Sequence, residues 1–313
     1  MKHILITGGC GYTGTILTNN LVDLGNKVTV IDTQWFGNYL KPRKNLNVIK
    51  LDIRDHDKIP MMGAETIVHL ASIANDPSVE LNSKLSWEVN VLATQKLIEN
   101  AIKNKVKHFI FASSGSVYGV KKEKEVTEDL SLVPISTYNK TKMISERILK
   151  SYENDIKFHC IRPATVCGFS PRMRLDVSVN MFVFQALKFR SMSVFGGDQI
   201  RPNIHIRDLV NIYKHFISKP ELPGGFYNAG FENLKIIEIA QKVAKIIPSE
   251  IVIKENNDPR SYRQNSNKLL STGFKKKFSV SDAIEEIKEK YESKQFIESD
   301  RCYTVKWMKE LNL

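Results

Sequence analysis

The sequence predicts an α/β fold built on a doubly wound parallel sheet. Short β-branched runs alternate with longer amphipathic stretches over the first two thirds of the chain, which is the pattern of strands joined through helices. Such connections place helices on both faces of a parallel sheet. The expected strands are 3–7, 27–32, 47–52, 66–71, 108–113 and 158–163. The expected helices lie near 12–24, 84–104 and 137–152.

The alternation weakens after Gly168, where loops rich in Gly, Pro and Arg follow. We therefore expect residues 1–168 to form the domain that carries the sheet, and residues 169–313 to form mainly a smaller, discontinuous lobe that binds substrate. The two parts are interleaved, because apolar runs near 202–218 and 225–230 predict returns to the sheet.

The composition fits a globular chain of one large domain or two smaller ones, with 42% apolar residues among 313. The net charge of +12 is spread over short mixed runs without interleaved aromatic residues, which favours a solvated surface and anionic small ligands over nucleic acid. The four cysteines fit neither a disulfide framework nor a zinc site, and no metal site is expected. No apolar run is long enough to cross a bilayer and the first residues lack the features of a signal peptide, so we expect a cytoplasmic protein without a membrane partner.

A glycine-rich turn follows the first expected strand directly. In "GGCGYTG", Gly9, Gly11 and Gly14 fit the pattern G-x-G-x-x-G, and Gly8, Gly11 and Gly14 fit G-x-x-G-x-x-G. Glycines between a strand and a helix permit a tight turn and let the helix amides approach a pyrophosphate. The turn therefore predicts a dinucleotide site and a Rossmann-type domain over residues 1–168.

An acid at the end of the second expected strand selects the dinucleotide. Asp32 lies where its carboxylate accepts hydrogen bonds from the adenosine ribose hydroxyls and repels a 2′-phosphate. Thr33 and Gln34 follow, and neither supplies a positive charge for that phosphate. The sequence thus predicts NAD rather than NADP as the cofactor.

Three residues form the predicted catalytic group. Ser114 follows the fifth expected strand, at the edge of the sheet where ligands bind. Tyr138 and Lys142 are four residues apart and therefore lie on one face of the next expected helix. We expect Lys142 to lower the pKa of the Tyr138 phenol toward neutrality, so that the phenolate takes a proton from a substrate hydroxyl. Ser114 would stabilise the charge that develops on the reacting oxygen.

His69 and two of the cysteines are expected to be structural. His69 occupies a strand position, which favours a buried or cofactor-flanking role over proton transfer. Cys160 and Cys167 have no basic neighbour in sequence that would activate a thiol, so we interpret both as packing residues.

Taken together, the motifs resemble the extended short-chain dehydrogenase/reductase family, specifically its NAD-dependent nucleotide-sugar epimerase/dehydratase branch of the UDP-glucose 4-epimerase type. The similar stretches span nearly the whole chain: "TGGCGYTG", "LDIRD", "HLAS", "NVLAT", "SSGSVYG", "YNKTK", "RPATVCG" and "RPNIHIRDL". The resemblance implies that Asp52 and Ile53 hold adenine and that Lys142 also binds the nicotinamide ribose. It places further residues at the cofactor: Tyr12, Thr13, Leu70, Ala71, Asn90, Tyr138 and Pro163.

The same resemblance implies a nucleotide-diphosphate sugar as the substrate. It points to Asn180 and Arg201 as contacts of the diphosphate, and arginine suits this task because its planar guanidinium binds two phosphate oxygens at once. Ser72 and Ser114 are also expected to bind the substrate. Arg174 of "SPRMR", and Arg260 or Arg263 of "DPRSYR", are further candidates. The alternative is that they are surface arginines on loops.

Epimerisation, 4,6-dehydration and simple oxidation or reduction share this machinery. Dehydratases of the family resemble one another in an Asp-Glu pair directly after the active-site hydroxyl, whereas Gly115 and Ser116 follow Ser114 here. The resemblance therefore favours a C4 epimerase, in which tightly bound NAD takes and returns the hydride through a 4-keto sugar. A nucleotide-sugar 4-dehydrogenase stays open, as does a non-catalytic NAD-binding sensor, because fold alone does not establish function. Family members pair two helices that resemble 84–104 and 137–152 across a two-fold axis, which implies a homodimer.

Overall fold

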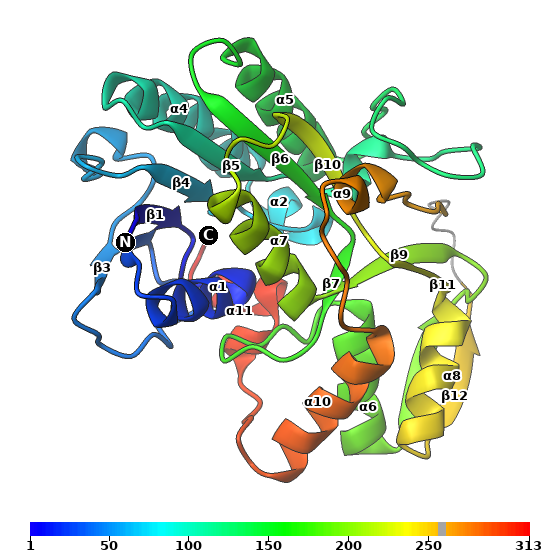
Figure 1. The fold of residues 1–313 in the computed structure, drawn as a ribbon. Coiled ribbons are helices and arrows are strands. Elements are labelled where there is room, and N and C mark those ends of the chain that lie inside the picture. The colour runs from blue at the N-terminus through cyan, green and yellow to red at the C-terminus, as the bar shows by residue number, and fades with distance from the viewer. Residues whose placement is uncertain (256–260) are drawn as a thin grey trace.

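A seven-stranded sheet of parallel strands lies at the centre of the computed structural model, which describes residues 1–255 and 261–313 (Figure 1). The strand order is β3-β2-β1-β4-β5-β6-β10. The direction of winding reverses between β1 and β4, which leaves a crevice at the carboxyl ends of these strands. The predicted doubly wound sheet is therefore confirmed. Its strands are β1 (His3–Thr7), β2 (Lys27–Asp32), β3 (Leu46–Lys50), β4 (Thr66–His69), β5 (His108–Ala112), β6 (Lys157–Pro163) and β10 (Gly225–Ala229).

Helices cover both faces of the sheet (Figure 1). Ile4, Leu5 and Ile6 of β1 are fully buried, which is why the central strands are continuous apolar runs instead of alternating ones. Within the described ranges, none of the helices is long and apolar enough to span a membrane. One face packs against α1 (Tyr12–Asp23), α7 (Ile206–Ser218) and α9 (Asn267–Ser271). The other face packs against α2 (Asp76–Leu81), α3 (Ser83–Trp87), the π-helical η2 (Glu88–Leu92), α4 (Ala93–Lys103), α5 (Thr137–Ser151) and α11 (Thr304–Glu310).

The smaller lobe lies beyond the sheet and has a hydrophobic core of its own (Figure 1). The strands of the lobe form a three-stranded sheet, β7 (Thr165–Cys167), β9 (Ile200–His205) and β11 (Glu232–Lys235), and a two-stranded sheet, β8 (Ser191–Phe195) and β12 (Glu250–Lys254). Its helices are α6 (Ser178–Phe189), α8 (Ile236–Ile246) and α10 (Val280–Glu292).

Three short 3-10 helices complete the described elements of the chain: η1 (His56–Lys58), η3 (Gly115–Tyr118) and η4 (Asp300–Cys302).

Of the two expected returns to the central sheet, the one near 202–218 is only partly correct. The sequence predicts that its first residues, 202–209, join that sheet, but β9 pairs with β7 and β11; the chain then enters α7, which packs on a face of the central sheet. A short apolar strand does not encode its partner, and β7 offers one because it follows almost directly on β6. The other return is correct, since β10 pairs with β6 at the edge of the central sheet.

Candidate active site

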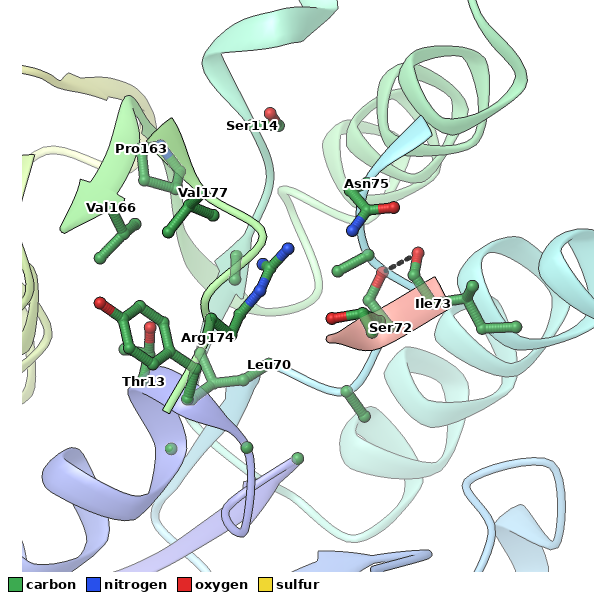
Figure 2. A pocket seen from close by; sticks show the side chains of 18 of the residues that line it. Thr13, Leu70, Ser72, Ile73, Asn75, Ser114, Pro163, Val166, Arg174 and Val177 are labelled. Atoms are coloured by element: carbon green, nitrogen blue, oxygen red, sulfur yellow. Dashed lines mark hydrogen bonds between the residues drawn. The ribbon is translucent and has the colours of Figure 1, made fainter. Parts of the chain in front are cut away.

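A cavity of about 580 Å³ lies at the carboxyl ends of the central strands, where the smaller lobe meets the sheet (Figure 2). Residues that follow β1, β2, β4, β5 and β6 form its wall together with the segment 172–178. This is the place where doubly wound sheets bind ligands. Most of the predicted site residues line it: Gly8, Gly11, Tyr12, Thr13, Gly14, Asp32, Asp52, Ile53, Leu70, Ala71, Ser72, Ser114, Tyr138, Lys142, Pro163, Arg174 and Arg201.

The glycine turn brings the backbones of β1, α1 and the segment after β4 into close contact. Gly8 has a φ of +76°, and a Cβ atom there would lie 2.6 Å from the backbone nitrogen of Ala71. A Cβ atom on Gly14 would lie 2.1 Å from the carbonyl oxygen of Gly8, so neither position accepts a side chain. Gly11 is the N-cap of α1 and lines the cavity. The turn, which we call the glycine cradle (Gly8, Gly11 and Gly14), thus carries no side chains at these positions and lies at the positive end of a helix, which fits the pyrophosphate of a dinucleotide.

Asp32 lines the cavity at the end of β2. One of its carboxylate oxygens accepts a hydrogen bond from the N–H of Cys10 at 2.9 Å, and the other accepts from the N–H of Gln34 at 2.7 Å. Burial raises the pKa of Asp32, and these two hydrogen bonds offset part of the rise. The carboxylate is thus fixed by the backbone, and its remaining lone pairs can accept ribose hydroxyls.

Hydroxyl groups converge where β5 meets the first turn of α5. The Oγ atoms of Ser114 and Ser116 are 2.7 Å apart, and Ser116 donates to the side-chain oxygen of Asn139 at 2.5 Å. Ser114 also lies close enough to Tyr138 to lower the pKa of its phenol. The N-cap Ser136 accepts a hydrogen bond from the N–H of Asn139, which fixes this end of the helix beside the strand. Two hydroxyls, from Ser114 and Tyr138, are therefore presented together.

The pKa of Tyr138 is not lowered toward neutrality, which corrects the expectation from sequence. Burial raises it to about 12, and the Ser114 side chain and the charge of Arg174 offset only part of that rise. Arg174, instead of Lys142, is thus the cation that acts on the phenol in this structure.

Lys142 is buried beneath the site. Its ammonium donates to the carbonyl oxygen of Ala112 at 2.8 Å and lies over the Phe111 ring, 5.0 Å from the centroid. Burial lowers the pKa of Lys142 to about 8. The Lys142 ammonium can therefore give up its proton at mildly basic pH.

Arg174 supplies positive charge inside the cavity, where its guanidinium extends into the space between Leu70 and Ser114 (Figure 2). Its Nε donates to the carboxylate of Asp176 at 2.8 Å, and Asp176 also accepts from the N–H of Thr304 at 3.1 Å. Burial alone would raise the pKa of Asp176, but the charge and the hydrogen bond of Arg174 outweigh burial and lower it to about 2. Among the described residues we find no hydrogen bond from Nη1 or Nη2 of Arg174, so these atoms are available to an anionic ligand.

Asn90 and Arg263 are not on the cavity wall, so their expected contacts stay predictions. The buried Asn90 side chain accepts from the N–H of Ile73 at 2.8 Å and donates to its carbonyl oxygen at 3.0 Å, so it holds the segment after β4 in place. Arg263 is exposed, and its neighbour Tyr262 lines the cavity instead, because successive residues of an extended segment point to opposite sides. Arg260 lies outside the described residues.

Asn180 is also absent from the cavity wall, and it links the smaller lobe to the glycine turn. Its fully buried side chain donates to Tyr12 Oη at 2.9 Å and accepts from the N–H of Gly168 at 3.0 Å. Tyr12 Oη in turn donates to the carbonyl oxygen of Gly168 at 2.6 Å. Ser170 Oγ donates to the carbonyl oxygen of Tyr12 at 2.8 Å. In this structure these hydrogen bonds attach the start of α1 to residues 168–170, and the diphosphate contact of Asn180 stays a prediction.

His69 and the two cysteines are structural, in agreement with the sequence. The buried His69 ring has Nδ1 2.6 Å from Thr7 Oγ1 and Nε2 2.8 Å from Thr94 Oγ1. Burial lowers its pKa to about 3, so the ring is neutral near pH 7. Cys160 and Cys167 are fully buried, and burial raises the pKa of both thiols.

Several residues of the cavity wall are not found by sequence reasoning. Asn75 has a φ of +76°, which is uncommon outside glycine, and its side chain caps α2. Asp76 follows, and Ser136 donates a hydrogen bond to its carboxylate. The "NDP" of residues 75–77 predicts a helix start, which gives the turn but not its place in the site. Asp176 and Arg172 carry no local signal beyond their proximity to Arg174 in "SPRMRLD".

Comparison with known proteins adds a family and a set of relatives. The model of the NAD dependent epimerase/dehydratase family matches residues 4–230. The Bacillus subtilis (strain 168) protein YtcB, named an uncharacterized UDP-glucose epimerase, is 31% identical over 261 residues, which cover 78% of this chain and 81% of the relative.

Two solved structures have the same fold. The UDP-glucose 4-epimerase of Thermotoga maritima, solved with UDP-glucose, matches with a TM-score of 0.85 at 23% identity and covers 94% of this chain and 100% of its own. DesIV of Streptomyces venezuelae, a dTDP-glucose 4,6-dehydratase solved with NAD, matches with a TM-score of 0.84 at 20% identity and covers 94% of this chain and 98% of its own. Because one fold carries both reactions, the reaction has to be argued from the site.

Proposed function

The chain belongs to the NAD-dependent epimerase/dehydratase family, and we propose that it is a nucleotide-sugar 4-epimerase. The proposed substrate is a nucleoside-diphosphate hexose, and the proposed reaction inverts the configuration at C4. The glycine cradle and the fixed carboxylate of Asp32 fit the pyrophosphate and the adenosine ribose of the cofactor.

NAD, when bound, supplies the acceptor for the substrate hydride and its donor on return. Lys142 is proposed to hold the nicotinamide ribose as well as to support Tyr138. The other residues proposed to hold the cofactor are Gly8, Gly11, Tyr12, Thr13, Gly14, Asp32, Asp52, Ile53, Leu70, Ala71, Tyr138 and Pro163, all of which line the cavity.

Tyr138 is the proposed base and acid. Ser114 would hold the C4 oxygen by a hydrogen bond while the phenolate takes the hydroxyl proton, and the phenol would give that proton back when C4 is reduced. Burial keeps the phenol protonated at neutral pH, so the phenolate needs positive charge nearby. Arg174 supplies such charge, and Lys142 lies one helical turn away on α5.

Arg174 and Arg201 are the proposed contacts of the diphosphate. They reach the cavity from different segments, Arg174 from the loop before α6 and Arg201 from β9. Two cations on separate elements can bind a doubly charged group from two sides. Ser72 lines the same cavity and is proposed to contact the sugar.

The observation that carries the proposal is that no spare acid accompanies Ser114. Gly115 and Ser116 follow it, and a Cβ atom on Gly115 would already lie 3.2 Å from the carbonyl oxygen of Pro163. Elimination of water needs a general acid at the sugar, whereas hydride transfer and return need only the tyrosine. Four carboxylates of the described residues, 1–255 and 261–313, line the cavity, and each already has a hydrogen-bond or ion-pair partner: backbone amides for Asp32, Arg54 for Asp52, Ser136 for Asp76 and Arg174 for Asp176.

Product analysis tests this proposal. The purified protein is incubated with UDP-, GDP-, CDP- and dTDP-hexoses, and the products are identified by NMR while NADH absorbance is followed. We expect one nucleotide sugar to equilibrate with its C4 epimer without net NADH and without loss of water. Accumulation of NADH with a keto sugar would identify a dehydrogenase, a 4-keto-6-deoxy sugar would identify a dehydratase, and bound NAD without turnover would indicate a sensor. Each of these three results contradicts the epimerase proposal.

We also propose a homodimer formed through η2, α4 and α5. These helices pack on one face of the sheet, and Leu92 at their surface is 57% exposed. Light scattering should give the mass of two chains for the wild type and of one chain for Leu92→Asp, because a buried charge disfavours the interface. A wild-type monomer at working concentration contradicts the proposal. A cytoplasmic location stays a prediction from sequence.

A further inference from the structure

Arg172 is a buried arginine with unused hydrogen-bond donors. The residue is 5% exposed, and within the described ranges neither Nε nor Nη1 has a hydrogen-bond partner. Burial, and next the charge of Arg174, lower the pKa of Arg172 to about 10, so the surroundings oppose its charge. Buried guanidinium groups are normally paired, because an unpaired buried charge is strongly destabilising. The unused donors therefore indicate a place for an anion.

The position of Arg172 is on the cofactor side of the cavity. Its guanidinium lies 4.0 Å from the centroid of the Phe36 ring, which belongs to the loop after β2 and Asp32. Two residues earlier, Ser170 Oγ donates to the carbonyl oxygen of Tyr12, the first residue of α1. Arg172 therefore enters the cavity from the smaller lobe beside the loop after β2, where its charge also acts on Asp32, and the start of α1 is held by Ser170 two residues earlier.

The surroundings of the guanidinium are aromatic on one side. Its contact with the Phe36 ring is a cation–π interaction, which uses none of its N–H groups as hydrogen-bond donors. The loop that carries Phe36 is itself covered by the C-terminal helix α11, because Trp307 Nε1 donates to the carbonyl oxygen of Trp35 at 2.6 Å. Met308 of α11 lines the same cavity. The arginine is thus rigidly placed before any ligand binds.

We propose that Arg172 binds the pyrophosphate of NAD from the smaller lobe and so retains the cofactor during the reaction. The glycine cradle offers backbone amides from the sheet, and Arg172 adds a planar group that can bind two phosphate oxygens. A cofactor held by both parts of the protein leaves only when the contacts between them break. Such retention suits an enzyme in which NAD is regenerated in place, so this inference rests on NAD as cofactor and on the proposed epimerase.

The test compares Arg172→Met and Arg172→Lys with the matched control Arg301→Met. Arg301 also lies over an aromatic ring, 5.1 Å from the Trp307 centroid, but it lines only a neighbouring cavity of about 420 Å³. For each protein we would measure the NAD retained through purification, the dissociation constants of NAD, adenosine and UDP on cofactor-stripped protein, and the melting temperature with and without NAD.

Arg172→Met should weaken NAD binding about 10- to 100-fold, as expected for lost hydrogen bonds to a charged group. Arg172→Lys should recover part of that loss, Arg301→Met should match the wild type, and adenosine, which lacks phosphate, should bind all four proteins alike. Without NAD, Arg172→Met should melt no lower than the wild type, because it removes an unpaired buried charge.

Two results would overturn the proposal. A purely structural role predicts that Arg172→Met lowers the melting temperature equally with and without NAD. Unchanged NAD binding together with weakened UDP binding would assign Arg172 to the substrate diphosphate. Product analysis decides the epimerase reaction separately, so the two proposals can fail independently.

Discussion

The half of the cavity that we propose for the cofactor is formed largely by backbone, whereas the half that we propose for the substrate is formed by charged side chains that hold one another. Gly8 and Gly14 shape the first half by lacking side chains, and Asp32 is fixed there by main-chain amides. In the second half, Arg174 is fixed by Asp176, and Asp176 by the N–H of Thr304.

This difference determines which half tolerates change. A backbone cradle admits almost no substitution, because any added atom meets main chain that cannot move away. Charged side chains can be exchanged without rebuilding the sheet. The substrate half is therefore where proteins with this fold can differ in reaction and substrate.

Tyr138→Phe should have the largest effect, because Tyr138 lies where the two halves meet. Loss of the phenolic proton acceptor should lower kcat about 10²- to 10⁴-fold, while bound NAD stays at the wild-type level. Single-turnover kinetics and NAD content after denaturation would measure both. Full activity in this variant would remove Tyr138 from the mechanism. Tyr303→Phe is a suitable control, because Tyr303 is far from Ser114 in sequence and does not line the cavity.

Gly14→Ala should damage the cofactor half alone. Its methyl group would lie 2.1 Å from the carbonyl oxygen of Gly8, so α1 must shift, at a cost of at least about 1–3 kcal/mol in unfolding free energy. We expect the variant to be purified with little NAD and to melt at a lower temperature. Gly25→Ala is the control for lost stability: its φ of +81° also strains an alanine, but nothing lies within 4 Å of the added Cβ, so it should melt lower and still retain NAD. Equal NAD content in Gly14→Ala and the wild type would contradict a close approach of cofactor to this turn.

Arg174→Met should weaken substrate binding and spare cofactor binding, and it should also lower kcat because the charge of Arg174 acts on Tyr138. The loss of hydrogen bonds to an anionic ligand should raise the dissociation constant of UDP about 10- to 100-fold and leave NAD content unchanged. Isothermal titration with UDP would measure the change. Arg263→Met, which alters an exposed arginine outside the cavity, should bind UDP as the wild type does. If both variants lost affinity equally, charge at long range and not contact would explain the effect.

The pH dependence of stability should reveal the Arg174–Asp176 pair, with the smallest effect. The pKa of Asp176 is lowered from 3.8 to about 2, so the pair stabilises the fold above about pH 4, and this stabilisation is lost as the pH falls toward 2. The difference in unfolding free energy between wild type and Asp176→Asn should therefore shrink by roughly 2 kcal/mol over that window. Urea titrations at several pH values would show it, and a difference that does not vary with pH would argue against the pair.

Most residues that the sequence predicts for the cofactor line the cavity, and their signals are local. A glycine turn between a strand and a helix, and an acid at the end of the next strand, are each read within a few residues. The substrate half is predicted less well because its contacts join distant segments. Asp176 meets Thr304 across more than a hundred residues, and no local pattern records such a pair.

The predicted site residues that lie off the cavity wall, or that have another partner, share a physical cause. Asn90 and Asn180 are polar residues near the cavity, but their amides satisfy buried backbone groups or hydroxyls instead of facing a ligand. Lys142 lies on the expected face of α5, yet the Ala112 carbonyl takes its ammonium. A sequence shows which polar groups are available, whereas the fold determines which partner each one finds.

The contact of Trp307 with the Trp35 carbonyl has a consequence for the order in which the protein matures. Trp35 leaves the ribosome early, but Met308, which completes the cavity wall, is added only after almost three hundred residues have followed the glycine turn. Domains begin to fold during synthesis, so the sheet can form while this wall is still missing. Tight binding of the cofactor is therefore expected only once α11 has been made, and a nascent chain stalled before α11 should bind NAD weakly even though its glycine turn is intact.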